Sequence, residues 1–156
     1  MGEIFADLNA LTDVYAATDQ SAVTMHGVPS SPTLAADVFD AIAKADVNID
    51  MISQSAPANG EVDISFTLPD KSLPAALSAL KPWKESVSHT SGLAKLSVEG
   101  FGMEHRPGIA ARMFRVLSGA GVAVRLVTTS ETKISYCIDR KDLDAAVSAT
   151  KQAFGV

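Results

Sequence analysis

Apolar residues follow two periods along this chain, and each period predicts one kind of element. They recur every three or four positions in residues 34–42 and 109–117, which predicts two amphipathic helices. They alternate with polar residues in 62–68 and 134–138, which predicts two half-buried strands. The same reading predicts further strands over 23–27, 48–55, 96–101 and 123–129, and helices over 73–80 and 141–154.

The predicted elements occur twice because the sequence repeats itself. Residues 27–55 match residues 102–130 at an offset of 75, with eight of the 29 positions identical. The match continues at an offset of 70 from Ile64 and Ile134 onward. The first copy therefore holds five extra residues (75 minus 70), which we place in a hairpin loop at residues 56–60.

Each copy has the order β-α-β-β-α and needs one more strand for a ferredoxin-like unit. Residues 85–89 can supply it in the first copy, but no sequence is left after Phe154 for the second. We expect residues 11–16 to complete the second sheet, with a loose arm as the alternative. The predicted fold is α+β, with antiparallel sheets and helices on one face. The predicted first unit is 18–91, inserted in a second unit of 11–17 plus 92–156, after an N-terminal extension of 1–10.

Composition and charge narrow the classes of partner. The 156 residues include 13 Lys and Arg against 18 Asp and Glu, a net charge of −5, and the basic residues are scattered. A nucleic-acid partner is therefore not expected, because such proteins usually carry a basic face. No apolar run is long enough for a membrane span, and the first ten residues lack the basic start of a signal peptide. We expect a cytoplasmic protein.

Candidate catalytic and metal-binding residues were sought and none forms a recognisable group. The three His residues and the single cysteine, Cys137, lack the spacing of a metal site. Glu61 and Asp63 have no supporting groups for acid–base chemistry. The segment 100–102 has two glycines but lacks the rest of a phosphate-binding loop. We therefore expect no catalytic residue, no metal and no cofactor in this chain.

Several segments together resemble the regulatory region of aspartokinase, which is built from two ACT domains. The segment Val-Asn-Ile-Asp-Met-Ile-Ser-Gln at 47–54 is similar to the part of that region that grips an effector amino acid. Residues 106–114 and 128–135 resemble its second ACT unit, and residues 11–14 resemble the strand that precedes its first. The kinase domain of that family, which opens with a lysine-glycine-glycine motif, has no match here.

The resemblance implies an allosteric domain that binds lysine or threonine for feedback control of aspartate-family biosynthesis. It places effector contacts at the strand–helix turns and on the strands beside them, where helix N–H groups suit a ligand carboxylate. In the first repeat these contacts are Ser30, Thr33, Leu34, Ala35, Asn48, Ile49, Asp50 and Gln54. In the second repeat they are Met103, Gly108, Ile109, Ala110, Ser130 and Glu131.

The two sites are not expected to be equal. Thr33 stands where the second repeat has Gly108, and Arg125 stands where the first has Asp50. The resemblance also implies a homodimer formed through the ACT units and a kinase catalytic chain as a partner. Two other functions stay open: a structural module that holds an assembly together with non-functional ligand sites, and an ACT sensor of another small metabolite. An enzyme is disfavoured.

Overall fold

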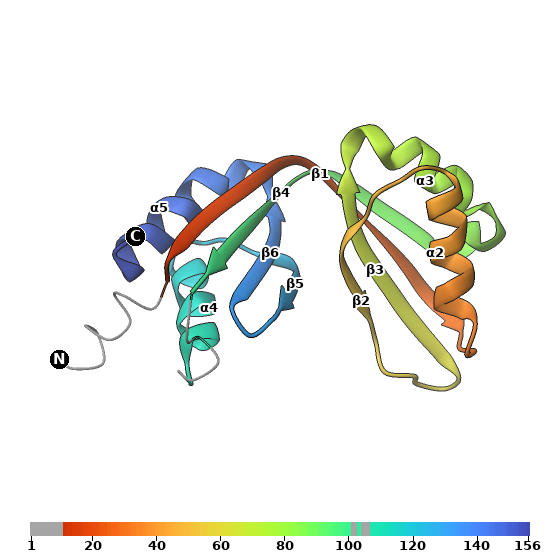
Figure 1. Cartoon of the computed structure of the whole chain (residues 1–156), viewed down its shortest axis with the longest axis horizontal. Coiled ribbons are helices and arrows are strands. Elements are labelled where there is room, and N and C mark those ends of the chain that lie inside the picture. The colour runs from red at the N-terminus through yellow and green to blue at the C-terminus, as the bar shows by residue number, and fades with distance from the viewer. Residues whose placement is uncertain (1–10, 101–102, 104–106) are drawn as a thin grey trace. The chain divides into compact units, whose positions relative to one another are not determined.

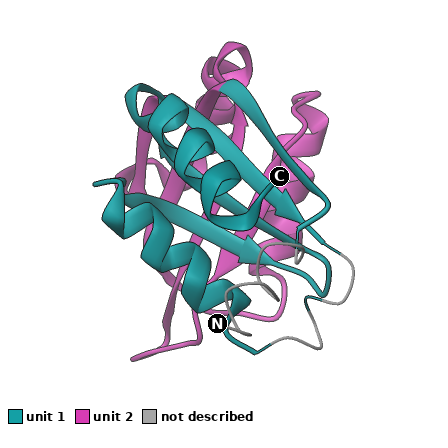
Figure 2. Cartoon of the chain, turned by 90° about the vertical axis from the view of Figure 1, so that its left-hand side faces the viewer, with its two compact units in different colours: residues 1–18, 93–156 teal, residues 19–92 magenta. Residues whose placement is uncertain are grey.

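The structure, a computed structural model, describes residues 11–100, 103 and 107–156. It divides the chain into two compact units, coloured separately in Figure 2. Unit 2 is Asp19–Gly92, and unit 1 combines the chain up to Thr18 with Leu93–Val156. The expected N-terminal extension, 1–10, lies outside the described residues. The domain bounds expected from the sequence, 18–91 and 11–17 plus 92–156, stay a prediction.

Two long strands, β1 (Asp13–Pro29) and β4 (Val87–Glu99), each contribute to both units (Figure 1). The sequence pattern predicts separate short strands in these segments, whereas each strand is continuous in the structure. Each strand has one left-handed residue at the unit boundary, Asp19 with φ +57° and Gly92 with φ +72°. Residues 11–16 are paired, not loose: Thr12 N–H donates to the Glu99 carbonyl at 2.7 Å, and β1 neighbours β4.

Unit 2 is a four-stranded sheet in the order β2-β3-β1-β4 with helices α2 and α3. Its antiparallel pairs join β3 to β1 and to β2. The five-residue insertion forms the predicted hairpin, where Asn59 and Gly60 both have positive φ, as a tight turn between strands requires. The bounds are α2 Leu34–Lys44, β2 Asp50–Gln54, β3 Glu61–Pro69 and α3 Leu73–Ala79, with 3₁₀ turns at Asp70–Ser72 and Lys81–Ser86.

Unit 1 repeats this arrangement in the order β1-β4-β6-β5. The part of β4 from Leu93 onward is the first strand of this repeat. The beginning of β1 forms an edge strand of the sheet, next to β4. The bounds are α4 Ile109–Gly119, β5 Val124–Thr129, β6 Lys133–Asp139 and α5 Leu143–Phe154, with a 3₁₀ turn at Arg140–Asp142. The α+β class and the two equivalent antiparallel units with helices are therefore confirmed.

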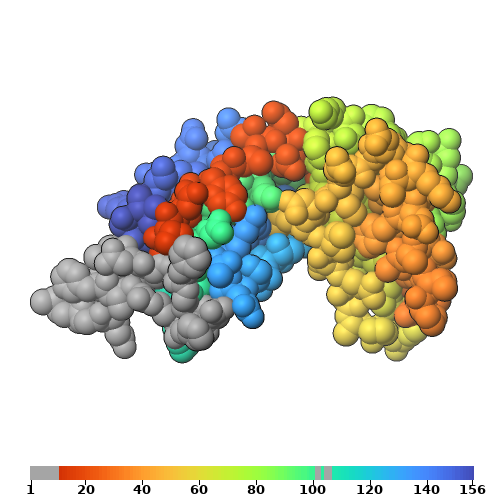
Figure 3. Space-filling model, viewed as in Figure 1, coloured from red at the N-terminus to blue at the C-terminus, as the bar shows by residue number. Residues whose placement is uncertain are grey.

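Each unit has its own core, built from equivalent positions of the repeat. The helix stripe of α2 (Leu34, Val38 and Ile42) and that of α4 (Ile109, Met113 and Leu117) are buried. Leu11 and Phe154 belong to the core of unit 1, and Figure 3 shows the start of β1 (red) lying against α5 (dark blue). Burial of these apolar side chains is the main stabilising contribution in each unit.

One helix position departs from the predicted stripe. The apolar pattern of residues 109–117 includes Phe114 and predicts that it is buried, but its side chain is 41% exposed. It follows Met113 by one residue and so points about 100° away from the core stripe. Its ring still makes an edge contact with Tyr136, with centroids 5.3 Å apart. The equivalent pair in unit 2, Phe39 and Phe66, has the same edge geometry at 6.0 Å.

Candidate functional site

The second repeat contains a pocket of about 240 Å³ at the amino end of α4. One side is formed by the first turn of the helix, and the other by the hairpin that joins β5 to β6. All six residues predicted as effector contacts of this repeat line the pocket, and two more join them. The lining residues are Met103, Gly108, Ile109, Ala110, Thr129, Ser130, Glu131 and Ile134.

The backbone at the helix start leaves room for a ligand. Gly108 precedes α4 in a left-handed conformation, with φ +95° and ψ −7°. Among the residues that the structure describes, no atom lies within 4 Å of the position that a Cβ would take there. Within the described part of the chain no side chain caps the helix, and its first turn carries no acidic residue. The amino end of α4 therefore presents N–H donors and a partial positive charge, both of which suit a carboxylate.

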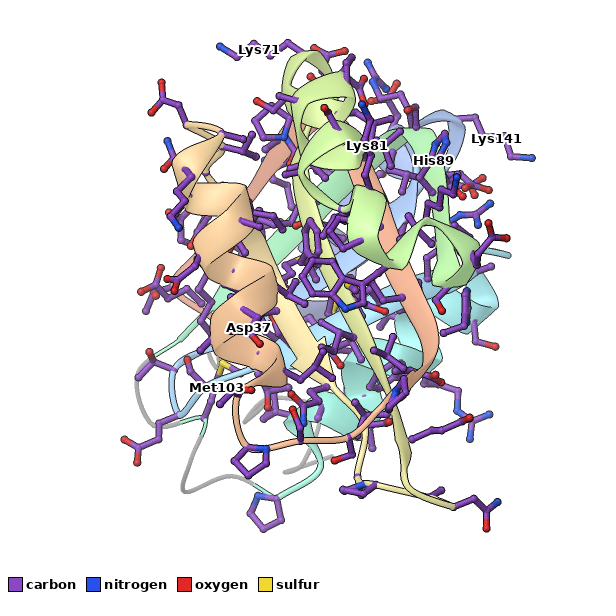
Figure 4. The ribbon with its side chains drawn as sticks, turned by 90° about the vertical axis from the view of Figure 1, so that its right-hand side faces the viewer. Asp37, Lys71, Lys81, His89, Met103 and Lys141 are labelled. Carbon is purple, nitrogen blue, oxygen red and sulfur yellow. The ribbon has the colours of Figure 1, made fainter. Side chains whose placement is uncertain are left out.

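The hairpin supplies polar groups and the pocket floor is apolar. Ser130 closes the turn, with its N–H donating to the Lys133 carbonyl at 2.8 Å. Glu131, the next residue, is exposed and lies in the pocket lining. Ile109 and Ile134 are 3% and 2% exposed, and Met103, labelled in Figure 4, is half-buried. The pocket thus combines a carboxylate, a helix amino end and an apolar surface.

Two residues that line the pocket, Thr129 and Ile134, were not predicted from the sequence as effector contacts. Thr129 is the last residue of β5 and directly precedes Ser130. Ile134 belongs to the inward-facing set of β6, which the alternation of apolar and polar residues had already identified. Adjacency to Ser130 and the inward face of the strand were the available signals for these two residues.

The turn of the first repeat has a different conformation. Thr33 precedes α2 with φ −103°, in the right-handed region, where Gly108 is left-handed. The Ser30 N–H donates to the Gly60 carbonyl at 2.8 Å, and the Ser31 and Thr33 hydroxyls lie 3.5 Å apart. The first turn of α2 also carries Asp37, labelled in Figure 4. A carboxylate at this position opposes the binding of a second carboxylate at the same helix end.

The remaining predicted contacts of the first repeat lie on or near these elements. Leu34 is buried in the core and Ala35 follows it on α2, while Ile49 packs against the same core. Asn48 is exposed just before β2. Asp50 and Gln54 are the first and last residues of β2, so they lie at opposite ends of the strand. The Asp50 carboxylate accepts a hydrogen bond from the Met51 N–H at 2.9 Å.

Arg125, which replaces Asp50 in the second repeat, is engaged elsewhere. Its guanidinium donates to the Asp139 carboxylate. That hydrogen bond, together with the charge of Asp139, raises the pKa of Arg125. Arg125 is not among the residues that line the pocket. Its positive charge is therefore directed to β6 and is balanced there.

The described residues form neither a metal-binding group nor a membrane-spanning helix. Among those residues, no three His, Cys, Asp or Glu side chains come together in a way that could hold a metal ion. No helix within residues 11–100, 103 and 107–156 is long and apolar enough to cross a membrane.

Comparison with known proteins agrees with the repeat. A family model described as the ACT domain matches residues 23–82 and again residues 96–154. The aspartokinase of Mycolicibacterium smegmatis is 39% identical over 153 residues, which cover 94% of this chain and 36% of that protein. The aspartokinase of Geobacillus stearothermophilus is 38% identical over 135 residues, covering 86% of this chain and 33% of that protein. The chain thus spans about a third of the length of these relatives.

Two solved structures have the same fold over nearly the whole chain. The regulatory subunit of aspartate kinase from Thermus flavus has a TM-score of 0.84 at 31% identity, covering 93% of this chain and 99% of that one. Aspartate kinase from Synechocystis has a TM-score of 0.87 at 36% identity, covering 96% of this chain and 28% of that one. The chain therefore belongs to the ACT-domain family, as a tandem ACT region of the aspartokinase regulatory type.

Proposed function

We propose that this chain is the regulatory part of an aspartate kinase and that the pocket of its second repeat binds lysine or threonine. The observation that carries the proposal is the pocket itself, in which Glu131 and the amino end of α4 line one cavity. An α-amino acid has one ammonium and one carboxylate, and both need partners when they leave water. This pocket offers one partner for each.

The ligand carboxylate would accept hydrogen bonds from the first N–H groups of α4. The open space beside Gly108 lets that backbone approach closely. The ammonium would bind the Glu131 carboxylate, with the Ser130 hydroxyl beside it. The ligand side chain would then lie against Ile109 and Ile134, which are buried and apolar.

Binding is proposed to be stronger in the second repeat than in the first. Both repeats have a helix amino end, but Asp37 places a negative charge on that of α2. Thr33 also replaces the left-handed glycine that opens the second site. Charge and backbone conformation thus support the expectation that the two sites are unequal. Effector binding by the eight contacts predicted in the first repeat is the weaker of the two proposals.

The phosphotransfer reaction, ATP plus L-aspartate, is proposed for a kinase domain or chain that this region regulates. A structure described as aspartokinase alpha and beta subunits is 32% identical to this chain, with a TM-score of 0.84. This similarity supports a separate kinase chain as one form of partner. We also propose a cytoplasmic location. The effector would act by favouring one of two arrangements of the assembly. The equilibrium between the two arrangements would shift by the ratio of the effector's affinities for them.

A structural module with silent ligand sites is the second candidate. The hydrogen bond from the Ser30 N–H to the Gly60 carbonyl and the conformation of Thr33 favour it for the first repeat. Isothermal titration calorimetry with the twenty amino acids separates the two functions. Saturable heat with lysine or threonine supports the sensor, and no heat with any amino acid at millimolar concentration supports the silent module.

The assignment of the pocket is tested with Glu131→Gln, which removes the charge that would hold the ammonium. The matched control is Glu85→Gln, an exposed position in unit 2. We expect Glu131→Gln to weaken binding at least tenfold, about 1.4 kcal/mol, and Glu85→Gln to leave it unchanged. Equal affinities for both variants and the unmodified chain would place the ligand elsewhere.

A further inference from the structure

The hairpin that carries Ser130 and Glu131 is held from outside the pocket by an aromatic residue of β1. Lys133, the first residue of β6, has its ammonium nitrogen 5.3 Å from the centroid of the Tyr15 ring. A cation within about 6 Å of a ring face is attracted by the negative charge of that face. Tyr15 lies near the start of β1, so the contact joins segments that are far apart in the sequence.

Glu99 of β4 lies between these two residues and fixes the ring. The strands neighbour one another in the order β1-β4-β6 (Figure 1), and Glu99 pairs with Lys133 in the antiparallel register. The Thr12 N–H and hydroxyl both donate to the Glu99 carbonyl, at 2.7 and 3.1 Å. The Tyr15 hydroxyl donates to the Glu99 carboxylate at 3.4 Å. Backbone and side-chain bonds therefore keep the ring beside the Lys133 ammonium.

Lys133 also closes the turn that forms one wall of the pocket. Its carbonyl accepts the Ser130 N–H at 2.8 Å and the Ser130 hydroxyl at 3.4 Å. Ser130 and Glu131 line the pocket, and so does Ile134, the residue that follows Lys133. Successive side chains of a strand point to opposite faces, so Ile134 faces the core while the Lys133 side chain lies on the other face. Lys133 therefore shapes the turn from the face of the sheet opposite the core.

The first repeat closes its hairpin with the same backbone bond but different side chains. At the offsets of the repeat, Ser130 corresponds to Ser55 and Lys133 to Asp63. The Ser55 N–H donates to the Asp63 carbonyl at 2.9 Å, and the Asp63 carboxylate accepts the Gly27 N–H of β1 at 2.8 Å. The second repeat thus uses a cation and an aromatic ring at the place where the first uses a carboxylate and a backbone N–H.

We propose that Tyr15 is a positioning residue of the pocket: its ring holds the Lys133 ammonium and thereby fixes the turn that presents Ser130 and Glu131. Tyr15 does not touch the ligand and acts only through Lys133. The pocket then depends on three separate parts of the chain, the start of β1, the amino end of α4 and the β5–β6 hairpin. The effect on ligand affinity rests on the proposed function, whereas the effect on the turn does not.

Amide hydrogen exchange of the whole chain, followed by nuclear magnetic resonance, tests the effect on the turn. Tyr15→Leu keeps an apolar side chain but removes the ring face. It should accelerate exchange of the Ser130 N–H about two- to fivefold, the range of an exposed cation–π contact. The reference is the Val122 N–H, which donates to the Leu117 carbonyl at 3.0 Å in the same unit and should not change. Tyr15→Phe keeps the ring face and should keep the Ser130 N–H protected.

Lys133→Met provides the matched control, since it removes the cation and keeps the ring. In that background Tyr15→Leu should produce no further change at the Ser130 N–H, and a full effect there would overturn the proposed route through Lys133. Equal acceleration at Ser130 and Val122 would show a general loss of stability and would overturn the positioning role. So would a Tyr15→Phe variant that behaves like Tyr15→Leu, or a Tyr15→Leu variant that leaves Ser130 unchanged.

The effect on the ligand is measured by calorimetric titration of lysine and of threonine. We expect Tyr15→Leu to weaken binding by about the same two- to fivefold factor and Tyr15→Phe to bind like the unmodified chain. Unchanged affinity in Tyr15→Leu, despite faster exchange at Ser130, would refute positioning of the pocket. An absence of binding by the unmodified chain would refute the proposed function, and exchange at Ser130 would still decide whether Tyr15 holds the turn.

Discussion

Replacing Gly108 by alanine tests the conformation that opens the pocket. Its φ of +95° lies where L-residues are disfavoured, and a Cβ placed there would meet no atom of residues 11–100, 103 or 107–156 within 4 Å. The cost of the substitution is therefore a backbone cost without a clash, about 1–2 kcal/mol. With a urea dependence near 2 kcal/mol per molar, the unfolding midpoint should fall by about 0.5–1 M.

The matched control lies at the other end of the same helix. Gly119 is the last residue of α4, its φ is not positive and its Cβ position is also open. Gly119→Ala should therefore raise stability by about 0.5–1 kcal/mol, because alanine favours the helix. Urea titrations followed by circular dichroism measure both variants. If Gly108→Ala were as stable as the unmodified chain, or shifted in the same direction as Gly119→Ala, the reasoning about this turn would be refuted.

Other predictions concern side chains of unit 1. Among the described residues the buried Tyr136 hydroxyl has no hydrogen-bond partner. Tyr136→Phe, which introduces the residue of the equivalent position 66, should therefore stabilise the chain by about 1 kcal/mol in urea titration. A loss of stability would show that the hydroxyl has a partner. Arg125→Ala should cost less than about 1 kcal/mol, because its ion pair with Asp139 is partly exposed to solvent. It should leave ligand binding unchanged, and lost binding would contradict the site. Burial raises the pKa of Cys137 from 9.0 to about 11, so native thiol labelling should stay slow at pH 8 and accelerate in urea. The raised pKa contributes stability below pH 9 that is lost between about pH 9 and 11, and fast native labelling at pH 8 would refute it.

The sequence was informative where one physical pattern determined the element. The stripes of α2 and α4 and the alternation in β3 and β6 identified the buried faces, because burial selects apolar residues at the period of each element. The Asn59–Gly60 turn followed from the residues that tolerate positive φ. Repetition of the whole pattern then gave two equivalent units.

The pattern failed where hydrogen bonding between strands continues through polar residues. Residues 17–22 lie between the predicted strands 11–16 and 23–27, but β1 runs through them, so strand continuity there is not visible in hydropathy. The exposure of Phe114 was also missed, because a residue at the edge of an apolar stripe can face either way.

The pocket was only partly predictable. Resemblance to a family supplied six lining residues, whereas Ile134 looked like ordinary core because an inward-facing strand residue can also line a cavity. The pairing of Arg125 with Asp139 depends on neighbouring strands, which the local sequence does not reveal.

Calorimetric titration of lysine and of threonine into the unmodified chain and into Glu131→Gln tests the central claim most directly. We expect one strong site per chain for one of the two amino acids. A hundredfold excess of that amino acid over its dissociation constant should stabilise the chain by about 2.7 kcal/mol. Loss of the heat in Glu131→Gln is expected. Equal binding by both proteins, or no binding by either, would contradict the claim that the second-repeat pocket is the effector site.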